Sequence, residues 1–183
     1  MKAANAVEIR RIRADEGLQL KALRLRALAD SPMAYGSTLA REQAYPDSLW
    51  HERAASGAAG DQVVTVVAEH DGRLLGMATG LVPERPHGQD PTMVGVFVES
   101  SLRRKGVGAA LVEEIIEWAK ARRLARESAR QSVGGSARLL IWITAGNEPA
   151  LVLYRRQGFR PTGATRPNAH TPDLVESEMQ LEL

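Results

Sequence analysis

The segment from residue 94 to residue 111 reads VGVFVESSLRRKGVGAAL. The apolar residues up to Val98 predict a strand, and the apolar spacing after the second glycine predicts a helix. Between them lie the adjacent cations Arg103, Arg104 and Lys105, followed by Gly106 and Gly108. Free N–H groups and the positive dipole end of a helix start favour an anion, and glycine lets phosphate oxygens approach the backbone. The segment therefore predicts a pyrophosphate site.

Two other phosphate loops do not match this segment. The dinucleotide-binding pattern G-x-G-x-x-G requires glycine where the chain has Leu111, and the cations here precede the glycines. The Walker A loop requires Gly-Lys followed by Ser or Thr, a triplet that the sequence lacks. Taken alone, the segment is also consistent with a glycine-softened turn that carries a solvated basic patch.

The residues before this segment predict helices and strands in alternation. The expected elements are a strand at 7–13, a helix capped by Asp15 and ending at Ser31–Pro32, a second helix opening near Asp47, a hairpin of strands 62–70 and 73–82 joined by Asp71-Gly72, a loop at 83–91 and a strand at 92–99. The hairpin is the clearest of these, because Asp-Gly is a two-residue turn that requires positive φ.

The residues after the segment continue the alternation. The expected elements are a helix at 105–123, a flexible connector at 125–136, a strand at 139–144, a short helix capped by Asn147 and ended by Gly158, a strand beginning at Phe159 and a final strand at 175–183. The apolar run 139–144 predicts a strand buried on both faces, and strict alternation predicts that the last strand closes the sheet. The fold class is thus α/β, one domain with a mixed sheet over residues 1–183.

Composition excludes several classes of function. The chain has 183 residues, no cysteine and a formal charge of +2, so thiol chemistry and thiolate metal sites are excluded and a nucleic-acid platform is disfavoured. Its four histidines show no metal-ligand spacing, so no metal is expected. The apolar runs fall far short of the roughly 20 residues that span a bilayer, and the chain start lacks a signal segment. We therefore expect a cytoplasmic protein without a membrane partner.

A second motif follows about forty residues after the first. Residues 147–159 read NEPALVLYRRQGF. Together with the spacing Arg103-x-x-Gly106-x-Gly108, this segment resembles the two signatures of the GCN5-related N-acetyltransferases, the GNAT superfamily, in the order that the family shows. The resemblance implies the GNAT acyl-CoA fold and acetyl-CoA as co-substrate. Ser100 stands where the family often has proline, and the segment at 125–136 is longer than usual.

The resemblance also implies a cofactor site. The pantetheine arm would pair with backbone groups of Val96, Phe97 and Val98, on a strand that splays from its neighbour, and the Val98 N–H would hold the oxyanion. The pyrophosphate would be wrapped by Arg103, Arg104, Lys105, Gly106, Val107 and Gly108. Alternatively, residues 96–98 simply pair within the sheet, and Arg104 is a solvated cation.

Asn147 and Tyr154 are seven residues apart and would share one helix face. On that face Asn147 would hold an amide of the cofactor, and the Tyr154 hydroxyl would give a proton to the departing thiolate. Each has a structural alternative, because Asn147 can be only a helix cap and Tyr154 only a core aromatic.

The acceptor amine must lose a proton before it attacks, and the sequence leaves the base open. The candidates are Glu99 at the strand end, Glu69, His70 and Glu42. Two aromatic residues, Tyr35 and Trp50, are candidates for the acceptor pocket, while Trp118 and Trp142 are assigned to the core.

The leading hypothesis is transfer of acetyl from acetyl-CoA to a primary amine, on a small molecule or a peptide, by direct attack in a ternary complex. Residues 1–60 would form the acceptor side and residues 61–183 the acetyl-CoA core. A non-catalytic acyl-CoA-binding module is the alternative, and nucleic-acid binding through paired arginines is the third reading. Many relatives are dimers, so the resemblance also allows a homodimer.

Overall fold

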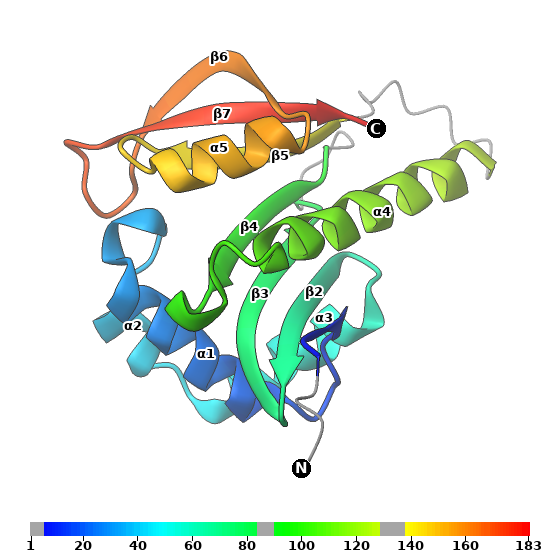
Figure 1. Cartoon of the computed structure of the whole chain (residues 1–183), viewed down its shortest axis with the longest axis vertical. Coiled ribbons are helices and arrows are strands. Elements are labelled where there is room, and N and C mark those ends of the chain that lie inside the picture. Colours follow the sequence, from blue (N-terminus) through cyan, green and yellow to red (C-terminus); the bar gives the residue numbers. More distant parts are fainter. Residues whose placement is uncertain (1–5, 84–89, 129–137) are drawn as a thin grey trace.

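The computed structural model describes residues 6–83, 90–128 and 138–183. These residues form one seven-stranded mixed sheet in the order β1-β2-β3-β4-β5-β7-β6 (Figure 1). The mixed α/β class predicted from the sequence is confirmed. Among the described residues, no helix is both long enough and apolar enough to cross a membrane.

The first three strands form an antiparallel sheet. They are β1 (Glu8–Arg11), β2 (Val63–His70) and β3 (Arg73–Leu81). The predicted hairpin is confirmed, with Asp71 at φ 50° and Gly72 at φ 74°, the left-handed conformation that a two-residue turn of this type requires. The loop predicted at 83–91 lies mostly outside the described residues.

Three helices and one short turn connect β1 to β2. They are α1 (Gly17–Asp30), the one-turn 3-10 helix η1 (Pro32–Ala34), α2 (Leu39–Gln43) and α3 (Asp47–Ala59). The prediction that Asp15 caps α1 is wrong by one residue. Glu16 occupies the cap position and its carboxylate accepts the Arg13 N–H at 2.7 Å, while Arg10 donates to it at 2.9 Å.

The diagnostic segment folds as predicted. It comprises β4 (Thr92–Val98), the 3-10 turn η2 (Ser100–Leu102) and α4 (Val107–Ser128). The helix runs five residues beyond the predicted end at Arg123, so the connector predicted from residue 125 starts too early, and its remainder lies outside the described residues.

The C-terminal elements are β5 (Arg138–Thr144), α5 (Glu148–Arg156), β6 (Arg160–Pro167) and β7 (Val175–Glu182). The last strand does not close the sheet, because β7 lies between β5 and β6 and leaves β6 at the edge. The run 139–144 is not buried on both faces either. Its side chains alternate between buried and half-buried up to Ile143.

Two apolar clusters cover opposite faces of the sheet. One packs α4 against β2, β3, β4, β5 and β7 and includes Trp118, whose assignment to the core is confirmed. The other packs α1 and α3 against β2 and β3 and includes Trp50, which is 1% exposed. Burying a large apolar side chain stabilises the fold by about 1.5–3 kcal/mol, so these clusters hold β4 firmly from both sides.

Candidate active site

The site begins where β4 and β5 separate. These parallel strands pair only at Thr92 with Leu140 and at Met93 with Ile141, after which β4 continues along β3 alone. Gly95 has a φ of 66° and lies at a register shift opposite Met77 to Thr79, which is a β-bulge. A bulge bends its strand, and glycine adopts positive φ without strain. The predicted splay is therefore present, and Figure 1 shows the two strands diverging.

Backbone alternation decides which groups of β4 face the split. The Glu99 N–H donates to the Leu75 carbonyl at 2.8 Å, and Phe97 is the register partner of Met77. In an antiparallel pair alternate residues direct their N–H and C=O groups to the same partner strand, so those of Phe97 face β3 and those of Val98 face the split. Of the three predicted residues, Phe97 thus has no free backbone group for a cofactor.

The loop between β4 and α4 presents unpaired amides. Arg104 has a φ of 62° and Gly106 a φ of 83°. Within the described residues, the backbone N–H groups from Arg104 to Ala109 donate to no acceptor, whereas the Ala110 N–H donates to the Gly106 carbonyl at 3.0 Å. The loop therefore offers N–H donors at the positive end of α4, as an anion site requires.

The three cations of the loop are not equivalent. The Arg103 side chain donates to the Val98 carbonyl at 2.8 Å and to Asp30 at 2.6 Å, so it ties the loop to β4 and α1. Hydrogen bonds from Ser31 and Arg103 hold the pKa of the Asp30 carboxyl below its usual value. Arg104 and Lys105 are exposed. These two side chains are available for an anion, and Arg103 is already engaged.

On the other side of the split, α5 places Asn147 and Tyr154. The Asn147 side chain accepts the Ala150 N–H at 3.3 Å, so the predicted cap is confirmed. Tyr154 is 5% exposed and packs edge-on against Phe159, with ring centroids 5.8 Å apart. Burial, and to a lesser degree the neighbouring Tyr35, raises the pKa of the Tyr154 hydroxyl well above its ordinary value. The hydroxyl therefore stays protonated at neutral pH.

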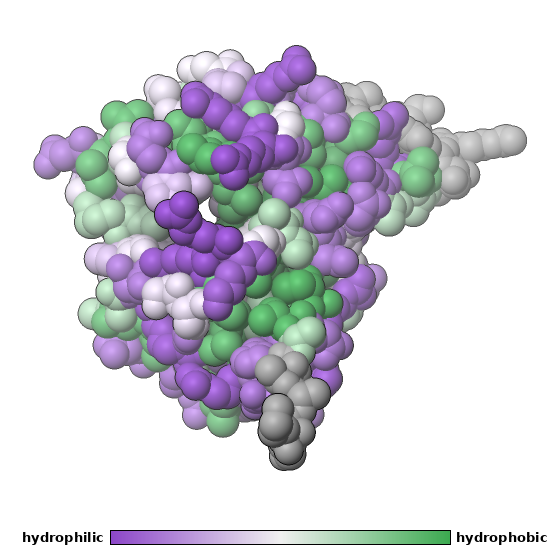
Figure 2. Space-filling model, in the orientation of Figure 1, coloured by the Kyte–Doolittle hydropathy of each residue, from purple (hydrophilic) through white to green (hydrophobic). Residues whose placement is uncertain are grey.

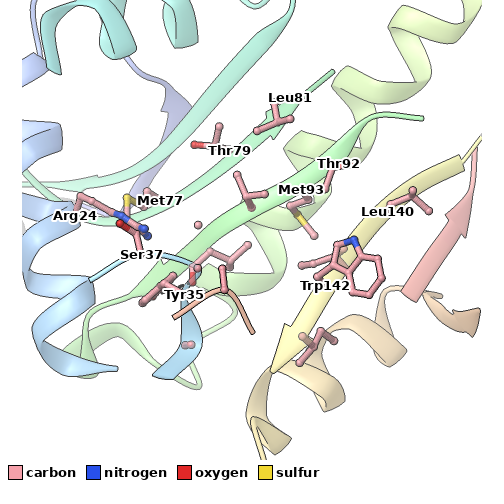
Figure 3. A pocket seen from close by; sticks show the side chains of 18 of the residues that line it. Arg24, Tyr35, Ser37, Met77, Thr79, Leu81, Thr92, Met93, Leu140 and Trp142 are labelled. Atoms are coloured by element: carbon pink, nitrogen blue, oxygen red, sulfur yellow. Dashed lines mark hydrogen bonds between the residues drawn. The ribbon is translucent and has the colours of Figure 1, made fainter. Parts of the chain in front are cut away.

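A cavity of about 1360 Å³ runs from this split across the sheet. Its walls come from α1, α2, α3 and the segment 34–37 on one side and from β5, α5, β6 and β7 on the other, with β2, β3 and β4 between them. Figure 3 shows Arg24, Tyr35 and Ser37 facing the cavity from the first side and Leu140 and Trp142 from β5. In the space-filling view an opening between these parts is flanked largely by hydrophilic residues (Figure 2).

The cavity gathers only some of the predicted site residues. Val96, Asn147 and Tyr154 line it, and so do Tyr35 and Trp50. The described residues of the phosphate loop, 103–108, lie outside its lining, as do Phe97 and Val98. The cavity and the loop thus form two parts of the site that meet along β4.

The candidate base Glu99 does not line the cavity. Its carboxylate oxygen lies 2.6 Å from the Arg26 guanidinium, which neutralises it. Glu69 is likewise bound to Arg10, at 2.6 Å, and His70 faces Asp71, at 3.6 Å. None of these three lines the cavity, so the structure does not place them at a reacting amine.

Glu42 is the one sequence-predicted base among the described cavity residues. It is 3% exposed, accepts three hydrogen bonds from Arg24 at 2.9–3.2 Å and lies 3.6 Å from Arg53. Burial alone would raise its pKa, but the hydrogen bonds and charge of Arg24 outweigh burial and lower the pKa. Glu42 is therefore an ionised structural anion at neutral pH and a weak base.

Tyr35 connects the acceptor side to the cofactor strand. Its hydroxyl donates to the Val96 carbonyl at 3.3 Å, and the Arg24 guanidinium lies 4.5 Å from its ring centroid. Burial raises the pKa of Tyr35 to about 12. This hydrogen bond engages the Val96 carbonyl, which the family resemblance predicts to bind the pantetheine arm.

Sequence reasoning missed several residues of the cavity. They are Glu52, Asp90, Arg166, Glu176 and Glu178. The assignment of Trp142 to the core is also wrong, since it is half-buried and lines the cavity. The alternation of the last strand was the available signal, because it places residues 176 and 178 on one face, but only the sheet order shows that this face meets the cavity.

Among residues 6–83, 90–128 and 138–183, no three His, Asp or Glu side chains are grouped so as to hold a metal ion. The donors that the two parts of the site present are the loop amides on one hand and two tyrosine hydroxyls and one asparagine of the cavity on the other. Such a set of donors can bind a thioester that carries a diphosphate group, and it can stabilise the negative charge that develops during acyl transfer.

Comparison with known proteins supports this chemistry. The model of the acetyltransferase (GNAT) family matches residues 25–159. The L-amino acid N-acetyltransferase AaaT of Escherichia coli (strain K12) is 27% identical over 144 residues, which cover 76% of each chain.

Solved structures share the whole fold. The yncA protein of Salmonella typhimurium, solved with its cofactor acetyl-CoA, superposes with a TM-score of 0.73 at 18% identity, covering 98% of this chain and 95% of that one. The ribosomal-protein-alanine N-acetyltransferase of Brucella melitensis has a TM-score of 0.69 at 25% identity, covering 96% and 99%.

Proposed function

The chain belongs to the acetyltransferase (GNAT) family and is an N-acetyltransferase with acetyl-CoA as co-substrate, and from that premise we propose that it acetylates a primary amine by direct attack in a ternary complex. The observation that carries the proposal is the convergence of two elements at one split. Free loop amides and the Val98 N–H come from one side, and the protonated Tyr154 hydroxyl comes from the other.

The loop would bind the pyrophosphate through its backbone. Positive φ at Arg104 and Gly106 turns successive N–H groups to one side of the chain, and no described residue accepts them. Lys105, Val107 and Gly108 complete the proposed cradle, with Arg103 holding it against β4 through the Val98 carbonyl.

The pantetheine arm would lie in the split, along β4. Val96 and Val98 face it with the alternate backbone groups that β3 does not use. Asn147, whose side-chain oxygen caps α5, retains a free amide nitrogen for a carbonyl of the arm. Tyr35 would release the Val96 carbonyl when the arm replaces its hydrogen bond.

The reaction itself exchanges one acyl bond. The lone pair of a neutral amine attacks the thioester carbon, a C–N bond forms, and the oxyanion is held by the Val98 N–H. When the C–S bond breaks, the Tyr154 hydroxyl gives its proton to the sulfur, the surplus proton of the amine leaves to water, and the tyrosinate takes up a proton from water again. The sequence has no cysteine, so no acyl-cysteine intermediate forms.

The two parts of the chain would bind different substrates, the acceptor and acetyl-CoA. We assign residues 1–60 to the acceptor side and residues 61–183 to the acetyl-CoA core, with the addition that β6 and β7 supply acceptor-side residues as well. Arg166, Glu176 and Glu178 line the acceptor cavity from those strands.

Release of free CoA from acetyl-CoA tests the proposal directly. The purified full chain is incubated with acetyl-CoA and a panel of amines, amino acids and short peptides, and free thiol is measured against blanks without acceptor. Acceptor-dependent thiol release that Tyr154→Phe reduces supports the proposal. Saturable acetyl-CoA binding with no release across the panel would instead identify a non-catalytic acyl-CoA-binding module.

A further inference from the structure

The cavity wall formed by β5 and β7 carries a row of side chains on one face. Alternation along β5 places Trp142 and Thr144 on the same face, and the register sets Trp142 opposite Glu178 and Thr144 opposite Glu176. All four residues line the cavity, and we refer to them as the β5–β7 wall. Figure 3 shows Trp142 on this side of the cavity, with Thr92 and Met93 of β4 across from it.

Charge pairing leaves the β5–β7 side of the cavity negative. Arg24 and Arg53 share one carboxylate, Glu42, at 2.9 and 3.6 Å, so that cluster is net positive. At the β5–β7 wall the one arginine of the described lining, Arg166, contacts Glu176 at 2.7 Å. Two carboxylates of the described lining, Glu52 and Glu178, have no basic partner in the described chain. At the β5–β7 wall an acceptor carboxylate would therefore find no unpaired cation, whereas a cationic group would find Glu178.

The β5–β7 wall already binds one cation of the chain itself, through an aromatic ring and a carboxylate. The Arg166 guanidinium lies 4.1 Å from the Trp142 ring centroid while it pairs with Glu176. An indole face and a carboxylate together form a site for a desolvated cation. Glu178, opposite the same indole, is half-buried and fixed by the Thr162 hydroxyl at 2.9 Å, so its second oxygen is free for another cation.

Thr144 provides a second, independent sign of a missing ligand. It is 5% exposed, lines the cavity, and its hydroxyl has no hydrogen-bond partner. A buried hydroxyl without a partner loses free energy that a bound N–H group restores. Thr144 is three residues before Asn147, at the end of the wall that meets the cofactor split.

We propose that the acceptor is an aliphatic diamine or longer polyamine, with the reacting nitrogen at Thr144 and a second ammonium held by Glu178, next to Trp142. Two residues of extended strand separate these positions by about 7 Å, which a five-carbon diamine spans. The inference rests on the proposed acetyl transfer and specifies its substrate class. It differs from the amino-acid acceptor in the name of the Escherichia coli relative.

Matched acceptors test the inference. The full chain is assayed for thiol release with cadaverine, with pentylamine, which lacks the second ammonium, and with L-norleucine, which adds a carboxylate. We expect kcat/KM for cadaverine to exceed that for the other two by about tenfold, the effect of one partly desolvated cation site. Glu178→Gln should remove this preference by raising the KM for cadaverine toward that for pentylamine. Glu182→Gln, on the same strand outside the cavity, is the control.

Equilibrium binding separates the two proposals. If no amine releases thiol, the proposed function fails, and calorimetry of cadaverine with the CoA-loaded chain then decides the substrate class. Saturable binding that Glu178→Gln weakens about tenfold supports the β5–β7 wall, and equal or absent binding overturns it. Equal turnover of cadaverine, pentylamine and norleucine, or turnover unaffected by Glu178→Gln, also overturns it. Circular dichroism melting of each variant confirms that it is folded.

Discussion

Burial raises the pKa of the Tyr154 hydroxyl and so decides which proton transfers it can take part in. A tyrosine in water has a pKa near 10, and the apolar surroundings of α5 and Phe159 raise that of Tyr154 further, because the ionised form would lose its hydration. Because a thiol has an ordinary pKa of about 8.5, Tyr154 is the weaker acid of the two. It donates a hydrogen bond to the sulfur as negative charge develops there, and transfer of the proton is completed only when the tyrosinate regains a proton from water. The residue thus acts late in the reaction.

Removing the Tyr154 hydroxyl tests this role. Tyr154→Phe keeps the ring packed against Phe159, so we expect an unchanged melting temperature and a kcat reduced by roughly 10²–10⁴-fold, the usual contribution of a general acid. The KM for acetyl-CoA should change little. Steady-state kinetics with a working acceptor make the measurement, and an unaltered kcat would rule out the acid role.

The raised pKa of Tyr154 also predicts a pH profile. The protonated hydroxyl is the active form, so activity should not decline through loss of this proton until the pH passes the ordinary tyrosine value of about 10. The kcat of the wild type is measured from neutral pH upward with an acceptor whose amine is already neutral. A decline with a midpoint well below that value, absent from Tyr154→Phe, would show that the hydroxyl is not shielded as described.

Glu42 predicts a pH dependence of stability. Its pKa is lowered from 4.5 in the folded protein, so its contribution is complete above the unfolded-state pKa and is lost as the pH falls through the folded-state pKa. Glu42→Gln leaves the half-buried Arg24 without its main carboxylate and should cost about 3 kcal/mol at neutral pH, with the deficit shrinking below pH 4.5. Urea unfolding at several pH values measures it, with exposed Glu52→Gln as the control. Equal stability of wild type and Glu42→Gln at pH 7 would be inconsistent with this account.

At the scale of elements, the bulge in β4 and the start of α4 create the site. Gly95 bends β4 away from β5 after two paired residues. The amides of the following loop and of the first turn of α4 have no acceptor, because no helical turn precedes them whose carbonyls could accept their N–H groups. Both features depend on a backbone conformation that glycine supplies. The two loop glycines, however, differ in what they require.

Alanine substitution should affect CoA binding differently at Gly106 and at Gly108. Gly106 has a φ of 83°, so Gly106→Ala strains the loop by about 1–2 kcal/mol and should weaken CoA binding by roughly tenfold. Gly108 has ordinary helical dihedrals, and an added Cβ would lie 3.5 Å from Leu153, which is normal contact. We therefore expect Gly108→Ala to bind CoA almost normally. Calorimetric titration of both variants makes the comparison, and equal losses would contradict the conformational argument.

Most elements were predictable because their periodicity is local. The Asp71-Gly72 hairpin, the Asn147 cap and the apolar face of α4 are each specified within a few residues. The five-residue helix α2 was missed because one turn has no measurable period, and Thr38 alone caps it. The insertion of β7 between β5 and β6 was missed because alternation specifies a strand's faces but not its neighbours.

At the scale of the molecule, the cofactor side was predictable and the acceptor side was not. The loop and α5 are contiguous motifs, whereas the cavity joins α1, α2 and α3 to β5, β6 and β7 across the split sheet. Glu99 became a candidate by its position in the sequence, and only the packing of α1 shows that Arg26 neutralises it. Conversely, Trp142 and Glu178 are 36 positions apart in sequence and meet only through register.

The central claim is that the amides from Arg104 to Ala109 bind the pyrophosphate of acetyl-CoA. Amide hydrogen exchange, resolved by peptide with and without CoA, tests it most directly, because unpaired amides exchange fast and bound ones do not. The account predicts rapid exchange at 104–109 in the free protein, strong protection there and along 96–98 when CoA is added, and no change in the β2–β3 hairpin. Exchange at 104–109 that saturating CoA leaves unaltered would contradict it.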